Sequence, residues 1–228
     1  MNFQQKEKNL KKYLEILKKC PLFENIEEND LIKMLSCLEA RVEEFDKHYT
    51  VFSEGSRAKY LGIVLSGTVQ IAQIDYSGNR TIISEIGEGE LFAEAFACAE
   101  VESLPVSVVA SARSEIMFIE CAHVLHTCSN NCGFHQRLIY NLMKDLALKT
   151  IMIHQRAEII SKRTTAEKLM AYLVSQSKRA GSRTFTIPFD RQGLADYLEV
   201  DRSGLSSEIG KLVKKGVIDC KKNRFTIL

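Results

Sequence analysis

Residues 191–218 read RQGLADYLEVDRSGLSSEIGKLVKKGVI, which is the pattern of two short helices joined by a tight turn. In the first helix, Leu194, Ala195 and Leu198 fall on one side at helical spacing, and the small Ala195 leaves room for a second helix to cross closely. Asp201 is placed to cap the second helix, because its carboxylate can accept hydrogen bonds from the free amides of the first turn. The second helix then carries an apolar stripe formed by Leu205, Ile209, Leu212 and Val213. These features predict a helix-turn-helix whose apolar side faces inward.

The outward side of the second helix begins with short or hydrogen-bonding side chains, namely Arg202, Ser203, Ser206 and Ser207. Such a surface lets a helix approach base edges in the DNA major groove, while an arginine can bind guanine with two hydrogen bonds. The helix ends at Lys214, Lys215 and Gly216, with cations near its negative end and a glycine where the backbone turns left-handed. The alternative is an ordinary helical hairpin whose polar side is merely solvated.

The distribution of charge favours the DNA-binding interpretation. The whole chain of 228 residues has a formal net charge of +2. Residues 161–228 hold 14 lysines and arginines against 7 acidic residues, a net charge of +7, whereas residues 1–160 hold 17 against 22, a net charge of −5. A basic C-terminal third suits a module that binds phosphates, because phosphate neutralisation releases counterions and drives association.

Composition also predicts where the protein works. No run of about 18 apolar residues could span a bilayer, and the N-terminal MNFQQKEKNLKKYL is too charged for the apolar core of a signal peptide. We therefore expect a cytoplasmic protein that makes no membrane contact. Seven cysteines, an odd number in a chain without secretory features, favour reduced thiols over a disulfide framework.

The first 130 residues have a different pattern. Residues 4–19 and about 28–38 are helical in pattern, and the Cys20-Pro21 step ends the first helix, since proline disfavours helix at the residue before it. Residues 41–120 consist of short β-rich runs separated by turn signals, which are typical of an antiparallel barrel or jelly roll. We expect residues 1–130 to form a domain with this architecture, and the family resemblance given below implies that it senses an effector.

Residues 131–161 have a helical pattern longer than that of a typical globular helix. Its broad apolar stripe comprises Leu138, Ile139, Leu142, Met143, Leu146, Ile151 and Ile153. A helix of about 28 residues extends about 42 Å, which is more than one face of a small barrel can cover. Part of the helix is therefore expected to pair with a second copy of itself as a dimerisation helix. In the alternative, the stripe packs only within the chain.

Residues 162–228 are expected to form a winged helix-turn-helix DNA-binding domain. A helix over 166–178 and a strand over 184–188 precede the helix pair, and the last residues, VIDCKKNRFTIL, alternate as a β-hairpin does. The hairpin has a basic tip, where Lys222 and Arg224 can lie along the sugar-phosphate backbone. The expected fold class is α+β, with an N-terminal antiparallel jelly-roll β-barrel, a long dimerisation helix and a C-terminal winged helix-turn-helix.

In this order of parts, the whole chain resembles the CRP/FNR family of bacterial transcription regulators. The stretches that carry the resemblance are FSEG at 52–55, YLGIVLSGTVQI at 60–71, GELFAEAF at 89–96, AEKLMAYL at 166–173 and IPFDRQGLADYLEVDRSGLSSEIGKL at 187–212. The resemblance implies a homodimer that binds a two-fold symmetric double-stranded DNA operator. It also implies contact with RNA polymerase and a switch driven by a small-molecule effector sensed in the barrel.

The resemblance assigns roles to individual positions of the helix pair. Arg202, Ser203 and Ser207 match the family's principal base-reading positions, and Arg191 and Gln192 match residues that contact phosphate. The best-known members have glutamate and arginine where this chain has Ser203 and Ser207, so its operator should differ from the standard half-site. Arg191 has an alternative, because it could instead pair with Asp190 or Asp196.

The sensor domain departs from the members that bind cyclic nucleotides. In those members a glutamate holds the ribose, and an arginine followed by serine or threonine grips the cyclic phosphate. Glu94 matches the glutamate, but Leu104 and Pro105 stand at the other two positions. Leucine cannot neutralise a phosphate, and proline offers neither hydroxyl nor backbone N–H. Cyclic AMP is therefore not expected. The predicted site for a less polar effector comprises Glu94, Leu104, Pro105, Val106, Ile153 and His154.

No cofactor or metal is predicted. Oxygen-sensing members of the family bind an iron-sulfur cluster through cysteines gathered near the N-terminus, whereas this chain has Cys20 there, with Cys37 and Cys98 well separated from it. The spacing of Cys121, Cys128 and Cys132 matches no familiar zinc or cluster motif. The histidines, none of them in a diagnostic haem motif, are His48, His123, His126, His135 and His154. A redox-responsive or haem-responsive regulator stays open as an alternative.

The sequence fits two other classes of protein less well. An enzyme with a catalytic cupin-like barrel would need a cluster of metal ligands, yet residues 50–120 contain no histidine. We therefore expect that the protein is not an enzyme. A small-molecule-binding adaptor whose winged helix contacts protein is the second alternative, and the +7 charge of residues 161–228 argues against it.

Overall fold

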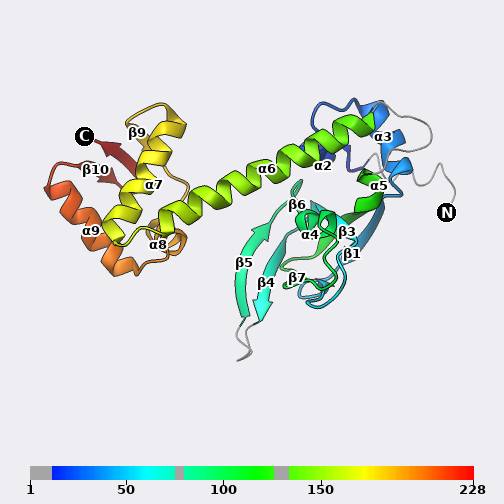
Figure 1. The fold of residues 1–228 in the computed structure, drawn as a ribbon, viewed down its shortest axis with the longest axis horizontal. Coiled ribbons are helices and arrows are strands. Elements are labelled where there is room, and N and C mark those ends of the chain that lie inside the picture. The colour runs from blue at the N-terminus through cyan, green and yellow to red at the C-terminus, as the bar shows by residue number, and fades with distance from the viewer. Residues whose placement is uncertain (1–11, 75–79, 126–133) are drawn as a thin grey trace. The chain divides into compact units, whose positions relative to one another are not determined.

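The computed structural model describes residues 12–74, 80–125 and 134–228 (Figure 1). The chain divides into two compact units, residues 1–147 and 148–228, and the division falls within helix α6 (Phe134–Ile160). The predicted boundaries at 130 and 161 stay a prediction. Among the described residues, no helix is both long enough and apolar enough to cross a bilayer.

The N-terminal unit begins with short helical segments, α2 (Leu14–Leu17), η1 (Pro21–Phe23) and α3 (Glu28–Cys37). Of the predicted helix over 4–19, the part before residue 12 lies outside the described residues. Pro21 is the first residue of η1, where the missing N–H of proline costs nothing. This arrangement is consistent with the expectation that the first helix ends at the Cys20-Pro21 step.

Two antiparallel four-stranded sheets follow, and they confirm the expected fold class. The first has the order β1-β8-β3-β6 and the second the order β2-β7-β4-β5. The strands are β1 (Arg41–Phe45), β2 (Thr50–Phe52), β3 (Tyr60–Ser66), β4 (Val69–Ile74), β5 (Arg80–Ile86), β6 (Leu91–Phe92), β7 (Ser107–Ala110) and β8 (Ser114–Glu120). The described strands therefore form two sheets, as in a jelly roll, rather than one closed ring. Helix α4 (Glu94–Cys98) follows β6, and α5 (Cys121–Leu125) follows β8.

A close approach between β3 and β6 explains why position 62 is a glycine. A Cβ atom on Gly62 would lie 2.1 Å from Cζ of Phe92, and the Phe92 side chain is fully buried. The Phe92 ring also contacts Phe52 of the other sheet at 5.8 Å between centroids. Only a residue without a side chain fits where β3 passes this ring.

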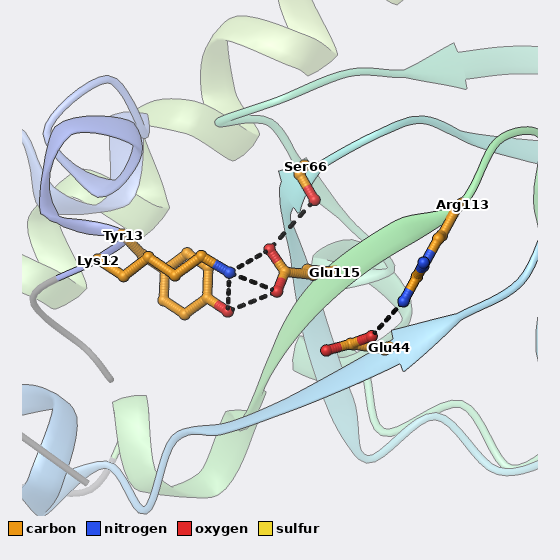
Figure 2. A network of polar contacts seen from close by, with 6 residues as sticks. All are labelled: Lys12, Tyr13, Glu44, Ser66, Arg113 and Glu115. Carbon is orange, nitrogen blue, oxygen red and sulfur yellow. Dashed lines mark hydrogen bonds and ion pairs between the residues drawn. The ribbon is translucent and has the colours of Figure 1, made fainter. Parts of the chain in front are cut away.

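A polar network ties the start of the chain to β8 (Figure 2). The ammonium of Lys12 lies 2.8 Å from Oε1 of Glu115, and the Tyr13 hydroxyl donates to the same oxygen at 2.9 Å. Ser66, the last residue of β3, donates to Oε2 of Glu115 at 3.3 Å. The hydrogen bond from Lys12 lowers the pKa of the Glu115 carboxyl below its ordinary value, and burial opposes this shift. The network therefore favours the ionised form of Glu115.

Helix α6 presents two different sides. Leu138 and Leu142 are buried in the core formed with α2, α3 and the β3–β8 pair, and Asn141 donates to the carbonyl oxygens of Leu22 and Glu24. Apolar side chains elsewhere on the helix are exposed, namely Tyr140, Met143, Leu148, Ile151, Met152 and Ile153. The apolar stripe expected from the sequence is therefore only partly used within the chain.

The C-terminal unit is the expected winged helix-turn-helix (Figure 1). It contains α7 (Thr165–Ala180), β9 (Thr184–Thr186), α8 (Arg191–Leu198), α9 (Arg202–Lys214), β10 (Ile218–Lys221) and β11 (Arg224–Ile227). The three strands form one antiparallel sheet in the order β10-β11-β9. Thr164 and Glu167 form a capping box at the start of α7. Burial of Tyr172 in the core of this unit raises its pKa to about 12.

Candidate nucleic-acid interface

The two helices of the candidate interface begin at aspartate caps. Asp190 accepts a hydrogen bond from the Gly193 amide at 2.7 Å, and Asp201 accepts one from the Gly204 amide at 2.8 Å. Between the helices, Glu199 adopts a left-handed backbone with φ of 53°. The caps satisfy amides that an isolated helix would leave unpaired, so both helix starts are fixed by local contacts.

The inner sides of α8 and α9 form the core of the winged helix. Leu194, Ala195 and Leu198 of α8 are buried, and so are Leu205 and Ile209 of α9. The predicted inner stripe of α9 ends before Val213, which is 39% exposed, because this residue lies on the edge of the buried face in the last turn. The small side chain of Ala195 is fully buried, as the close helix crossing requires.

The outer side of α9 is open to solvent. Its predicted base-reading residues are exposed and occupy the first two turns: Arg202, Ser203, Ser206 and Ser207. Within the described part of the chain, the Arg202 side chain makes no hydrogen bond or ion pair. An arginine in this position can bind a base edge without giving up a contact inside the protein.

Ser203 has a second role that the sequence did not indicate. Its hydroxyl donates to Oδ2 of Asp201, the carboxylate oxygen that also caps α9. The hydrogen bond from Ser203 lowers the pKa of the Asp201 carboxyl, and the Gly204 amide lowers it further. While it donates to this carboxylate, the Ser203 hydroxyl can accept a hydrogen bond from a base, and it can donate one only if it turns away.

The two predicted phosphate-binding residues of α8 contact other groups of the same unit. Arg191 is half-buried, with Nη2 3.6 Å from Sγ of Cys220 and the guanidinium over the Phe225 ring. Gln192 donates to Oδ1 of Asp196 at 2.8 Å. The sequence left open that Arg191 pairs with Asp190 or Asp196. In the structure Asp190 caps α8 and Asp196 accepts from Gln192, and Arg191 contacts Cys220 and Phe225.

The wing carries further cations of the C-terminal unit. Lys222 and Arg224 are exposed at the turn between β10 and β11, and Lys222 has a positive φ of 56°. Asn223 anchors this turn, since its Nδ2 donates to the carbonyl oxygen of Ile187 and the Ile187 amide donates to the carbonyl oxygen of Asn223. The β-hairpin of the wing thus holds its basic tip on a fixed turn.

Sequence reasoning missed two residues that support the turn. Lys168 of α7 donates to the carbonyl oxygens of Leu198 and Glu199 at 3.2 and 3.4 Å. A cation at the negative end of α8 is favourable. Arg156 of α6 lies 3.6 Å from a Glu199 oxygen and over the Tyr197 ring. The sequence carried no signal for these contacts, because the partners are separated by 30 residues or more.

The residues predicted to bind an effector have different environments. Glu94 opens α4 and is 5% exposed, after Ala93 with a positive φ of 62°. Leu104 is 2% exposed, and its backbone pairs with Gly55 and Ser56. Val106 is also buried, whereas Pro105 is exposed. Ile153 and His154 are exposed on the part of α6 that belongs to the C-terminal unit. Whether these residues form one site stays a prediction.

Comparison with known proteins assigns both units to families. A family model described as a cyclic nucleotide-binding domain matches residues 42–131, and one described as a Crp-like helix-turn-helix domain matches residues 167–228. The chain belongs to the CRP/FNR family of transcription regulators. Its family and fold are those of DNA-binding regulators and not of enzymes.

Solved structures of CRP/FNR regulators share the fold of this chain. The c-di-GMP-responsive global regulator CLP of Xanthomonas campestris is 16% identical, with 88% of this chain and 99% of that chain covered and a TM-score of 0.55. The sensor domain of the transcriptional regulator DNR of Pseudomonas aeruginosa is 21% identical, with 66% and 94% covered and a TM-score of 0.50. A search of curated proteins found no match.

For this CRP/FNR regulator, the predictions about cofactors stay predictions. Among the residues with a described position, no group of three or more histidine, cysteine, aspartate or glutamate side chains could hold a metal ion. The local cysteine group singled out from the sequence is only partly described, since Cys128 and Cys132 lie outside the described residues, as does His126. Among the described residues, Cys121 lies beside Cys98, with 3.2 Å between the two sulfur atoms.

Proposed function

We propose that this CRP/FNR regulator acts as a homodimer that binds a two-fold symmetric operator through α9 and responds to an effector other than cyclic AMP. The observation that carries the DNA-binding part is the exposed side of α9, where Arg202 has no described partner and serines surround it. In a dimer, two copies of α9 would enter successive major grooves about 34 Å apart.

The proposed phosphate contacts come from α8 and the wing. Arg191 and Gln192 lie in the first turn of α8, and Lys222 and Arg224 lie at the wing turn. These contacts are sequence-independent, so they should supply affinity for any duplex and make it sensitive to salt. Selection of bound duplexes from a random pool tests the proposal. A reproducible two-fold symmetric site with a guanine in each half would support it, whereas recovery of unrelated duplexes would overturn it.

The dimerisation part rests on the second side of α6. Tyr140, Met143, Ala147 and Ile151 are exposed and follow one another at spacings of three and four residues, so they share one side of the helix. Apolar side chains in such a row are typical of helices that pair with another helix. Ile151→Glu should convert the dimer to a monomer in sedimentation experiments, because it places a charge in the proposed seam.

Met152 provides a matched control for this test. It is 62% exposed, apolar and adjacent to Ile151, but it lies about 100° around the helix. Met152→Glu should leave the dimer intact. A monomeric wild-type protein, or equal effects of the two substitutions, would overturn dimerisation through this side of α6.

The effector part rests on Leu104. A buried leucine at a position where cyclic-nucleotide-binding members have an arginine offers no cation to the phosphate. Calorimetric titration with cyclic AMP should therefore give no binding heat, and micromolar affinity would overturn this part. Contact with RNA polymerase belongs to the same proposal, and transcription with purified polymerase on a template that carries the selected operator tests it.

A further inference from the structure

Two cysteines of the N-terminal unit lie in direct contact although 22 residues separate them in the sequence. Cys98 is the last residue of α4, and Cys121 is the first residue of α5. Their Sγ atoms are 3.2 Å apart, within hydrogen-bond distance for sulfur. The sulfur atoms of a disulfide are about 2.05 Å apart, so the pair needs only a small further approach to form one.

An open hollow of the surface lies beside the pair, lined by Cys121 and by Ala97, the neighbour of Cys98. Cys98 is half-buried, and Cys121 lines an open hollow of about 280 Å³. Arg57 and Lys59 line the same hollow, as does the acidic Glu100. The backbone amide of Cys121 donates to the Lys59 carbonyl at 3.0 Å, which fixes the start of α5 beside the hollow. A molecule the size of a peroxide can therefore reach this part of the surface.

The two thiols are not equivalent. The hydrogen bond with Cys121 lowers the pKa of Cys98, and burial and Glu94 oppose the shift. The hydrogen bond with Cys98 raises the pKa of Cys121, and burial raises it further. This asymmetry suits a pair in which the sulfur of Cys98 is the nucleophile and Cys121 keeps its proton until the second step.

We propose that Cys98 and Cys121 form a reversible dithiol–disulfide pair that small peroxides oxidise. The Cys98 thiolate attacks one oxygen of hydrogen peroxide, the O–O bond breaks, and the departing hydroxide takes a proton to become water. Cys98 is then a sulfenic acid. The sulfur of Cys121 attacks the sulfur of Cys98, the S–O bond breaks, and the proton of Cys121 leaves with the hydroxyl as a second water. Two thiols lose two electrons, and one peroxide gains them.

The proposal concerns a modification site that does not rest on DNA binding. The disulfide would link the end of α4 to the start of α5, so it would give the N-terminal unit two covalent forms. The two forms differ in the number of free thiols, so a count of thiols distinguishes them without any DNA-binding assay. Failure of the thiol experiment and failure of operator binding are therefore separate results.

The test uses the full-length, fully reduced protein treated with hydrogen peroxide and then alkylated in denaturant. The chain has seven cysteines, so intact mass should show seven alkyl groups before oxidation and five after it, with seven restored by dithiothreitol. Trypsin leaves Cys98 in the peptide 81–113 and Cys121 in the peptide 114–137, which also contains Cys128 and Cys132. Fragmentation of the linked peptides must therefore assign the bond to Cys121.

Variants sharpen the assignment. Cys98→Ser and Cys121→Ser should each abolish the linked peptide, and a dimedone adduct on Cys98 should appear in Cys121→Ser. Cys220→Ser is the matched control, because this half-buried cysteine contacts Arg191 instead, and it should still lose two alkylation sites. Seven alkylated thiols after peroxide treatment of the wild type, or a bond from either cysteine to Cys128 or Cys132, would overturn the proposal even if a variant fails to fold.

Discussion

Arg202→Ala gives the sharpest test of base reading by α9. Arg202 is the first residue of α9, its side chain is exposed, and it has no polar partner among the described residues. Truncation therefore removes no contact that holds the winged helix together. The melting temperature should stay close to that of the wild type, and the effect should appear in DNA binding.

The expected magnitude follows from the contact that is lost. A bidentate pair between arginine and guanine contributes about 1–3 kcal/mol of discrimination, which corresponds to about 5–150-fold in affinity for each half-site. Loss from both half-sites of a symmetric operator doubles the free energy. Arg202→Lys should fall between the wild type and Arg202→Ala, because lysine keeps the charge but lacks the planar fork.

The assay is a fluorescence anisotropy titration of the selected operator and of a scrambled duplex at one fixed salt concentration. Arg202→Ala should weaken operator binding and leave the scrambled duplex nearly unchanged, and it should no longer distinguish guanine from the other bases at the contacted position. Lys222→Ala is the control, since loss of a phosphate contact should weaken both duplexes alike and reduce the salt slope. An equal loss on both duplexes for Arg202→Ala would refute base reading by this residue.

Three predictions concern stability. Gly62→Ala should destabilise the N-terminal unit by about 1–3 kcal/mol in urea unfolding, because its Cβ would overlap the packed Phe92 ring, and an unchanged midpoint would contradict this packing. The lowered pKa of Glu115 means that its ionised form stabilises the fold at neutral pH and that this stabilisation is lost below about pH 4.3, as pH falls through the lowered value. The difference in unfolding midpoint between wild type and Glu115→Gln should therefore be largest near pH 7 and shrink as pH falls below about 4.3, and a difference that stays constant at acid pH would count against the network. Lys168→Met should lower the stability of the C-terminal unit by about 1 kcal/mol in thermal unfolding, because two carbonyl oxygens at the end of α8 lose their donor. An unchanged melting temperature would show that these two hydrogen bonds do not stabilise the unit.

The sequence predicted the features of the helix pair that depend on near neighbours. The Asp201 cap joins residues three positions apart, and Gly216 has the expected positive φ of 68° just after α9. Both are decided by backbone chemistry within one turn of helix. The short β-rich runs separated by turn signals likewise predicted an antiparallel barrel or jelly roll, and the described strands form the two sheets of a jelly roll rather than a closed barrel.

Features that depend on distant residues could not be predicted in the same way. The apolar stripe of α6 has a single periodicity in the sequence, yet Leu142 is buried and Met143 is 66% exposed. Which part is buried depends on contacts with α2 and α3. The meeting of Cys98 and Cys121 depends on how α4 and α5 pack, and the spacing of the two residues in the sequence did not indicate it. Periodicity predicts which side of a helix is apolar, but it does not predict which part of the protein packs against that side.

The end of α6 is attached to the helix-turn-helix by a buried side chain and by an exposed ion pair. Ile159 is 5% exposed in the core of the C-terminal unit, while the Arg156–Glu199 pair is about half exposed on both sides. Exposed ion pairs contribute little, about 0–1 kcal/mol, whereas a buried isoleucine contributes several times more when it is packed. A displacement of this end of α6 would therefore reach the core shared with α8 and α9 through Ile159. The ion pair at Glu199, being exposed, contributes little to this attachment.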